Sequence, residues 1–392
     1  MQASDFDRSC PICSARQTTL LRLLRYALFD DLPLSGLTSI VVCMECGMVF
    51  NQLDGGANAL NAYYQSNHHA LISSTPGSGG LTEVELQRYQ RLFKRLRLEQ
   101  EQAKLIMDFG CGKGGWLEWL KHIGFSQLIG IEKSAACRES IQNCVLINVY
   151  AEVADLPENT WPQIVLLSHV LEHLYDPLTE LRKLVDKSEK NAYFFIEVPN
   201  LPGMLDCDNP WSWLFFEHIN HFDESSLCNL VRRAGLEVTQ LGYWSFDPET
   251  GQEQECLYLV CRRATTEYRS EQKASDSALW SGRLNAMLTQ RPLPDSLMAS
   301  LDLKRPLALW GCSQYTMLVL GMHEEIRLNL RCLFDASSAK IGRRIAGIEI
   351  EHPMNLRNLT NDHLLLLPHS IYLDAMRKKL SDSGLYFDTL VF

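Results

Sequence analysis

Residues 105–115, LIMDFGCGKGG, decide how this chain folds. The apolar run LIMDF predicts a short buried strand, and the glycines after it predict a tight turn that opens a helix. Glycines at Gly110, Gly112 and Gly115 let the backbone approach a bound nucleotide and let the helix pack close to the sheet. The same spacing satisfies the dinucleotide pattern GxGxxG, so the loop alone predicts a nucleotide-type cofactor without choosing its class.

Apolar runs of the same kind recur after this loop, and amphipathic stretches separate most of them. This alternation predicts a parallel sheet with helices on both faces, and the last two runs predict an antiparallel pair at one edge. The predicted strands are 105–109, 128–132, 145–150, 164–168, 192–198, 236–244 and 255–261. A charge-laced helix is expected before them, from Glu83 to about Gln102. The fold class is α/β, with a Rossmann-like seven-stranded core.

Two smaller units flank this core. The small-residue stretch STPGSGG (74–80) predicts a linker, and a second alternation of strands begins after a polar stretch near 265–292. The predicted domains are 1–80, 81–265 and 266–392. Strands of the last unit are expected at 306–313, 331–335 and 363–368. Gly311, Asp335 and Lys340 lie where such a smaller α/β unit would hold a nucleotide.

Two CxxC pairs stand in front of the core. Cys10-Pro-Ile-Cys13 and Cys43-Met-Glu-Cys46 are separated by 29 residues, and Gly47 suits the tight turn of a metal knuckle. Two thiolates from each knuckle complete a tetrahedral set with no open position. The sequence therefore predicts one structural zinc ion in a small N-terminal domain.

The composition limits the possible partners. The chain has a formal net charge of −10, and a broad acidic balance argues against nucleic-acid binding, which needs a basic face. The first residues lack the cationic start and apolar core of a signal peptide, and the longest apolar runs are too short to span a bilayer. A cytoplasmic chain without a membrane partner is expected. Its thirteen cysteines, an odd number, do not indicate a disulfide framework.

Polar residues close several of the predicted strands. Glu132 ends the second strand, where a carboxylate can accept both ribose hydroxyls of either cofactor class. The segment SHVLEHL (168–174) follows the fourth strand and EVPN (197–200) closes the fifth. An NAD-dependent oxidoreductase would have no use for the first of these segments. His169 and His173 within it are predicted to be a packed pair, and a metal on them is discounted because no third ligand is evident.

With these residues in view, the chain resembles the class I S-adenosylmethionine-dependent methyltransferases. DFGCGKGG, IEKS, SHVLEHLYDP and IEVPN look like that family's core motifs. The paired knuckles, and residues 306–353 as a third Rossmann-like domain, resemble a subset that includes sugar C-methyltransferases. The resemblance implies S-adenosylmethionine as cofactor, with Glu132 on the ribose, Glu152 and Val153 beside the adenine, and His169 near the sulfonium. The cofactor-binding residues that it implies are Asp108, Gly110, Cys111, Gly112, Glu132, Lys133, Glu152, Val153, Ser168 and His169.

The aromatic segment 211–222 resembles the acceptor site of that subset. Its pattern Tyr-His-Glu-His-x-x-Tyr-Phe-Ser places the catalytic histidine at His218 and the neighbouring glutamate at Glu217. The chain departs from the pattern at Phe215 and His221, where the family has tyrosine. Tyr63 or Tyr64 is expected to reach the site as a hydrogen-bond donor.

The predicted function is methyl transfer to a carbon of a nucleotide-linked keto sugar. A histidine suits the removal of the acceptor proton because its pKa lies near neutrality. One alternative is an O-methyltransferase acting on a glycan or small metabolite, which Phe215 and His221 favour. Another is a non-catalytic nucleotide-binding scaffold, against which the intact Asp108, Gly110, Gly112 and Glu132 argue. The sequence leaves the oligomeric state open.

Overall fold

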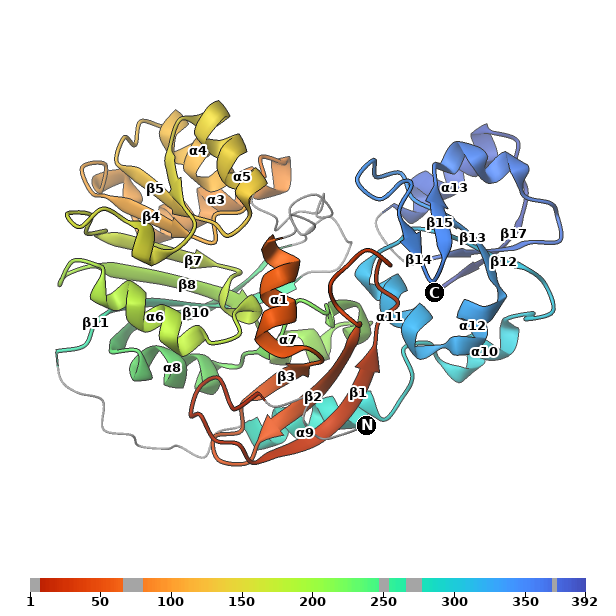
Figure 1. The fold of residues 1–392 in the computed structure, drawn as a ribbon, viewed down its shortest axis with the longest axis horizontal. Helices are drawn as coiled ribbons and strands as arrows, with labels where there is room; N and C mark the ends of the chain where they lie inside the picture. Colours follow the sequence, from red (N-terminus) through yellow and green to blue (C-terminus); the bar gives the residue numbers. More distant parts are fainter. Residues whose placement is uncertain (1–7, 66–79, 247–253, 266–276, 369–371) are drawn as a thin grey trace.

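The computed structural model describes residues 8–65, 80–246, 254–265, 277–368 and 372–392, and three sheets with their helices lie within these ranges (Figure 1). Of the predicted linker at 74–80, only Gly80 belongs to the described residues. Among the described residues, no helix combines the length and apolar character needed to cross a bilayer.

The core sheet has seven strands in the order β10-β11-β8-β7-β4-β5-β6. Its strands are β4 (Ile106–Phe109), β5 (Leu128–Ile131), β6 (Asn148–Tyr150), β7 (Ile164–Ser168), β8 (Tyr193–Pro199), β10 (Leu236–Phe246) and β11 (Gln254–Arg263). Strands β4 to β8 pair in parallel, whereas β11 runs antiparallel to both β8 and β10. The predicted seven-stranded α/β core with an antiparallel edge pair is confirmed.

One predicted strand is shorter than expected. The run 145–150 begins in a π-helical turn, η2 (Ile141–Val145), and Leu146 takes a positive φ of 58° before β6 starts. The apolar side chains of Val145 and Ile147, on either side of Leu146, are buried. A short apolar run therefore looked like a longer strand, because burial alone does not separate a helical turn from a strand.

Helices flank the core sheet on both faces, and several begin at side-chain caps. Thr82, Ser134, Asp176 and Asp223 each accept a backbone N–H of the first turn of their helix, which satisfies a donor that would otherwise lack a partner. The helical segments are α3 (Glu83–Leu96), η1 (Leu98–Gln100), α4 (Gly115–His122), α5 (Ala135–Ser140), η3 (Val153–Asp155), η4 (Leu171–His173), α6 (Pro177–Asp186), α7 (Leu201–Asp206), η5 (Pro210–Trp213) and α8 (Glu224–Arg233).

The front sheet has the order β1-β2-β3-β9. It contains β1 (Thr18–Arg25), β2 (Leu37–Cys43), β3 (Val49–Leu53) and β9 (Asn220–His221), and α1 (Gly56–Gln65) follows β3. Strand β9 comes from the predicted acceptor segment, and its two residues pair with Phe50 and Val49. The front sheet is thus completed by residues of the region that should bind the acceptor.

The third sheet has the order β14-β15-β13-β12-β16-β17 and is parallel except at β14. Its strands are β12 (Leu307–Trp310), β13 (Leu330–Phe334), β14 (Arg344–Ile345), β15 (Ile348–Glu351), β16 (Leu364–Leu367) and β17 (Asp388–Val391). The accompanying helical segments are α9 (Ser277–Leu288), α10 (Asp295–Ser300), α11 (Gln314–Met322), α12 (Glu324–Asn329), η6 (Pro353–Asn358) and α13 (Leu373–Asp382). The expected smaller α/β unit is present.

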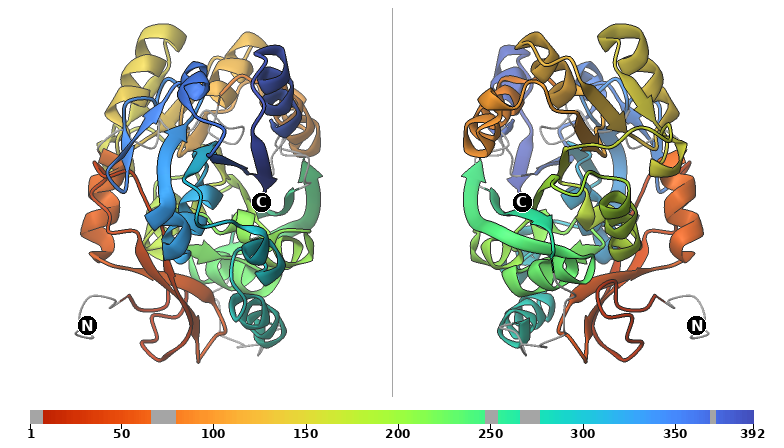
Figure 2. Two further views of the ribbon diagram at one scale, coloured as in Figure 1. Left: turned by 90° about the vertical axis from the view of Figure 1, so that its right-hand side faces the viewer. Right: turned by 90° about the vertical axis from the view of Figure 1, so that its left-hand side faces the viewer.

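The front sheet packs against the third unit through α11. Gly321 of α11 lies so close to β1 that a Cβ there would stand 2.0 Å from the Arg25 carbonyl oxygen. The Ala27 N–H donates to the Met317 carbonyl oxygen at 2.8 Å. Figures 1 and 2 show the front sheet at one end of the molecule, next to both larger sheets. A single apolar cluster joins Tyr26 and Tyr63 with Trp211, Phe216 and Leu318.

Candidate active site and cysteine cluster

The loop after β4 is shaped by glycines. Gly110, Gly112 and Gly114 all take positive φ angles, which L-residues with a side chain rarely adopt. A Cβ on Gly110 would lie 2.6 Å from Val170 Cγ2. The turn therefore requires glycine both for its backbone shape and for its contact with the segment after β7.

Glu132 closes this loop from the end of β5. One carboxylate oxygen accepts the Gly112 N–H at 2.9 Å and the other accepts the Ser134 N–H at 2.8 Å. A carboxylate has about four acceptor positions, so both oxygens keep capacity for ribose hydroxyls. Lys133 is exposed beside it, and exposed Glu152 with buried Val153 follows β6. These residues all lie at the carboxyl ends of neighbouring parallel strands, where ligands bind in such sheets.

Two other predicted cofactor residues are buried. Asp108 is 7% exposed at the end of β4, and burial raises its pKa to about 7, although nearby Arg88 acts in the opposite direction. The Cys111 side chain points toward the sheet. Its Sγ lies so close to Gly130 of β5 that a Cβ added to Gly130 would be only 2.7 Å away. Cys111 therefore packs the loop onto β5 through its side chain.

Helix α3 contributes a charged residue that the sequence did not single out. Arg88 is buried and donates to Glu197 at 2.8 Å and to Glu85 at 3.3 Å. Ser168 is hydrogen-bonded to both Arg88 and Glu197. Arg88 therefore ties α3 to the ends of β7 and β8. An arginine in a charge-laced helix carries no sequence signal that distinguishes it from the exposed ones.

His169 lies beside this ion pair in a left-handed backbone conformation, with φ of 56°. Its Nδ1 is 3.2 Å from Glu172 Oε1, and its Nε2 is 3.6 Å from Cys256 Sγ and 3.8 Å from Glu197 Oε2. His173 approaches the same carboxylate oxygen, with its Nε2 3.9 Å from Glu172 Oε1. Each histidine also belongs to a separate group of possible metal ligands: His169 lies with Glu197 and Cys256, and His173 lies with Glu172 and His218.

The buried carboxylates near His169 suit a cationic ligand. Glu172 and Glu197 are 1% and 0% exposed. Within the described part of the chain, Glu172 Oε2 and Glu197 Oε1 are buried without a hydrogen-bond partner. Buried acceptors without partners are costly, and a ligand that carries ammonium and sulfonium charges would offset that cost.

The predicted acceptor residues converge from separate elements. Tyr63 of α1 donates to Glu217 Oε1 at 2.8 Å. The ring of His218 packs edge-on against His173, with centroids 4.8 Å apart, and against Phe215 at the same separation. The His173 Nδ1–H donates to the Glu217 carbonyl oxygen at 3.2 Å. Tyr64 follows Tyr63, and its ring centroid is 6.5 Å from that of His173.

A pocket opens beside His218 at the ends of β8 and β11. Its lining includes Asn200, Met204, Trp213, His218, His221 and Glu255. The Asn200 amide nitrogen donates to Glu255, while its Oδ1 is buried without a partner among the described residues. The pocket thus combines an aromatic wall with unused hydrogen-bonding capacity, as a site for a polar small molecule should.

His221 plays a structural role. Its Nε2–H donates to Asn51 Oδ1 of β3 at 2.9 Å, and burial, together with the charge of Arg8, lowers its pKa to about 4. A histidine with so low a pKa is a weak proton acceptor at neutral pH. His221 is therefore a poor candidate for a general base.

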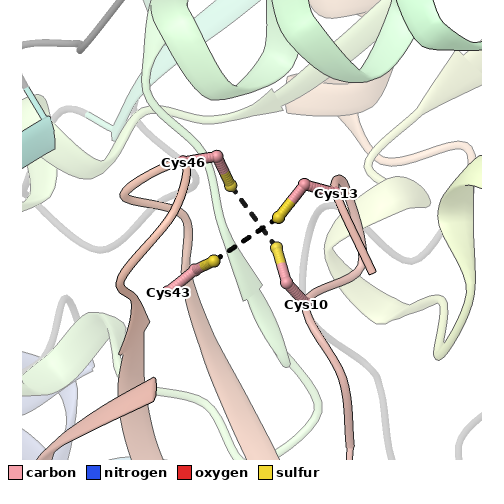
Figure 3. A group of neighbouring side chains, drawn as sticks. All are labelled: Cys10, Cys13, Cys43 and Cys46. Atoms are coloured by element: carbon pink, nitrogen blue, oxygen red, sulfur yellow. Dashed lines mark hydrogen bonds between the residues drawn. The ribbon is translucent and has the colours of Figure 1, made fainter. Parts of the chain in front are cut away.

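The four front cysteines meet at one point. Cys10 lies 3.5 Å from Cys46 and Cys13 lies 3.5 Å from Cys43, measured between sulfur atoms, and all four sulfurs lie within 4.8 Å of one another (Figure 3). A tetrahedral zinc site with Zn–S bonds of about 2.3 Å needs sulfurs about 3.8 Å apart. The donor set and its spacing fit a metal ion.

The two knuckles share one backbone design. The Ser14 N–H donates to the Cys10 carbonyl oxygen, and the Gly47 N–H donates in the same way to that of Cys43. Ser14 and Gly47 both have positive φ angles, of 62° and 74°. The sequence indicated this turn at Gly47, whereas Ser14 takes it without the glycine signal.

Comparison with known proteins identifies the core. Residues 82–241 match the sequence model of a family described as a methyltransferase domain. The chain therefore contains a class I S-adenosylmethionine-dependent methyltransferase domain and is an enzyme. The coarser part of the sequence prediction is confirmed.

Individual relatives are distant. C-methyltransferase NovU of Streptomyces niveus is 22% identical over 212 residues, which cover 52% of this chain and 47% of NovU. The chain thus spans about half the length of that relative. Among solved structures, N-methyltransferase NodS of Bradyrhizobium japonicum WM9 is 15% identical with a TM-score of 0.38, covering 51% of this chain and 97% of NodS. Magnesium protoporphyrin IX methyltransferase of Synechocystis PCC 6803 is 16% identical with a TM-score of 0.39, covering 52% and 98%.

Proposed function

We propose that this chain transfers a methyl group from S-adenosylmethionine to a carbon of a nucleotide-linked keto sugar. The observation that carries the proposal is that His218 lines a polar pocket beside the strand ends of the methyltransferase domain, while Tyr63 of the front unit donates to the neighbouring Glu217. The similarity to the C-methyltransferase NovU supports the same choice of acceptor atom. In this proposal the chain divides into domains at 1–80, 81–265 and 266–392.

The cofactor would lie across the carboxyl ends of β4, β5 and β7. Glu132 would accept the ribose hydroxyls, Gly110 and Gly112 would let the backbone approach, and Val153 with Glu152 would flank the adenine. Asp108, Lys133, Cys111, Ser168 and His169 complete the proposed cofactor region. When bound, S-adenosylmethionine supplies an electrophilic methyl group on a positively charged sulfur. The buried carboxylates of Glu172 and Glu197 suit that charge.

His218 would act as the general base. It takes the proton from the carbon beside the ketone, while Glu217 keeps the segment in place and contacts the imidazole or the substrate. The Tyr63 hydroxyl donates to Glu217, and Tyr63 or Tyr64 would supply a donor to the enolate oxygen. A donor placed at a developing oxyanion contributes strongly to such reactions.

Phe215 keeps a second function open. Its ring packs against His218, where the resembling enzymes carry a tyrosine hydroxyl. An O-methyltransferase needs a base but no donor to an enolate, so Phe215 favours methylation of a hydroxyl on a glycan or small metabolite.

The cysteine cluster is proposed to hold one structural zinc ion. All four ligands come from the protein, so no coordination position remains for a substrate. Cys10 and Cys43 belong to a buried apolar cluster that also contains Phe50 of the front sheet and Val165 of the core sheet. The ion would therefore stabilise the junction between the front unit and the methyltransferase domain.

Isotope exchange distinguishes carbon from oxygen methylation. In deuterated water, with S-adenosylhomocysteine in place of the methyl donor, a carbon methyltransferase should exchange the acidic proton of its keto-sugar acceptor. The acceptor is found first by a mass-shift screen of nucleotide sugars with labelled cofactor. Methyl transfer without any proton exchange would contradict the proposed methylation of carbon and favour O-methylation.

A further inference from the structure

The third unit reaches the proposed catalytic pair through one side chain. Gln314, the first residue of α11, accepts the Phe216 N–H at 3.2 Å through Oε1 and donates to Glu217 Oε1 at 3.1 Å through Nε2. The two ends of one amide thus hold the backbone of one residue and the carboxylate of the next. His218 follows directly.

Glu217 is consequently held by two units at once. Tyr63 of α1 and Gln314 of α11 donate to the same carboxylate oxygen, and Glu217 is only 7% exposed. A buried carboxylate with two donors has a restricted orientation, because losing either bond leaves the charge less well satisfied.

Helix α11 cannot shift freely away from this contact. Gly321 packs onto the backbone of β1, and Met317 accepts a hydrogen bond from Ala27 just after that strand. The Ser313 side chain caps the amino end of α11 by accepting the Thr316 N–H at 3.1 Å. The position of Gln314 is therefore fixed by the front unit as well as by its own helix.

The polar groups of the segments after β12 and β13 hydrogen-bond to one another within the third unit. Asp335 accepts the N–H groups of Cys312 at 2.9 Å and Ser337 at 2.8 Å, and pairs with Lys340 at 3.0 Å. Gln314, at the start of α11, instead directs its side-chain amide to Phe216 and Glu217.

We propose that Gln314 is a positioning residue for methyl transfer, which fixes Glu217 and through it His218, so that the third unit completes the active site. The proposal rests on the proposed roles of Glu217 and His218. It assigns the third unit a part in the reaction that does not depend on nucleotide binding there.

Three variants of the full chain test the proposal. Gln314→Leu removes both hydrogen bonds at similar size, and kcat should fall by roughly 10- to 100-fold with a smaller change in KM, as expected for a misplaced reacting group. Gln314→Glu puts a second carboxylate beside Glu217; two such groups retain a proton to higher pH, so the acidic limb of the kcat profile should move to higher pH. Gln290→Leu is the matched control, because it makes the same substitution at an exposed position of the third unit and should preserve kcat.

A double variant shows whether the effect passes through Glu217. Glu217→Gln combined with Gln314→Leu should be no slower than Glu217→Gln alone, because residues that act as a unit are not additive. Fully additive losses, or a Gln314→Leu enzyme with normal kcat and normal pH profile, would overturn the proposal.

Amide exchange gives a readout that does not require methyl transfer. The Phe216 N–H should exchange faster with deuterium in Gln314→Leu than in the wild type or in Gln290→Leu. If the wild type transfers no methyl group, the proposed function fails. The exchange result still shows whether Gln314 holds the backbone of Phe216. Unchanged exchange at Phe216 would refute the positioning role of Gln314 whatever the reaction.

Discussion

At the scale of single residues, buried Asp108 should make cofactor binding depend on pH. Burial raises the pKa of its carboxyl group to about 7, so the group is partly protonated in the ligand-free protein at neutral pH. A cationic ligand beside it favours the ionised form and lowers that pKa. Binding should then release a proton, and affinity should rise as the pH increases toward and through 7.

Calorimetry checks this prediction. Titration of S-adenosylmethionine in two buffers with different ionisation enthalpies should show net proton release near pH 7, and Asp108→Asn should abolish it. Cofactor affinity that is the same at pH 6 and pH 8 in the wild type would mean that Asp108 does not sense the ligand.

Glu132 should contribute directly to cofactor affinity. Hydrogen bonds to a charged group contribute about 1.5–3 kcal/mol, and Glu132→Ala should weaken S-adenosylmethionine binding by about that amount. Its carboxylate also accepts the Gly112 N–H, so the variant loosens the glycine loop as well. Glu139→Ala, at an exposed position of α5, is the control that should bind nearly normally. Equal cofactor affinities of the two variants would mean that Glu132 does not contact the cofactor.

The two histidines of the acceptor segment should behave differently. His218→Ala should lower turnover by about 10²–10⁴-fold, the usual effect of losing a general base, with nearly unchanged cofactor affinity. His221→Gln should lower turnover much less than His218→Ala but reduce stability, because the His221 ring supports β3 through Asn51. Steady-state kinetics and thermal melting of both variants make the comparison. An active His218→Ala enzyme would shift the base to His169 or His173.

At the scale of elements, the cysteine knuckles should depend on metal. Purified protein should contain close to one equivalent of zinc by elemental analysis. Cys43→Ser should lose the ion and unfold the front sheet, since metal binding and folding are coupled in such small units. Cys144→Ser is the control, because Cys144 is exposed and far from the cluster in sequence. Folded and active protein without zinc would contradict the assignment.

The elements that could be predicted from sequence are those with local signals. The apolar runs ending at Phe109, Ile131 and Ser168 became core strands, and the CxxC spacing brought four sulfurs together. Such features depend on residues near one another in the chain. The roles of individual site residues remain predictions, because proximity does not establish chemistry.

Long-range contacts could not be predicted. Strand β9 has two residues, and only its pairing with β3 makes it a strand. Gln314 lies 97 residues after Glu217, and Arg88 lies 109 residues before its partner Glu197. Each of these residues is an ordinary polar side chain in its own segment, so only the tertiary arrangement reveals its partner.

At the scale of the whole molecule, Arg8 joins the front unit to the acceptor segment. It is 3% exposed and donates to Asn51 of β3, Ile219 and Asn220 around β9, and Leu174 and Tyr175 after η4. Burial lowers its pKa to about 10, so the guanidinium remains charged at neutral pH. One side chain thus donates to acceptors from three separate segments, and one of these segments directly follows His218.

Removing this connection should affect stability and catalysis together. Arg8→Met leaves several buried carbonyl groups without a donor, and the free energy of unfolding should fall by about 3–5 kcal/mol. Arg8→Lys keeps the charge but loses the planar fork that reaches several acceptors at once. It should fold with an intermediate loss and still show reduced kcat, because Ile219 and Asn220 follow His218 directly. Urea unfolding and kinetics are the measurements, with Arg16→Met, at an exposed position, as the control. If Arg8→Met unfolds within about 0.5 kcal/mol of the control, a range typical of surface substitutions, the front unit is not held through Arg8. If Arg8→Lys loses stability but keeps full kcat, the connection stabilises the fold without positioning the acceptor segment.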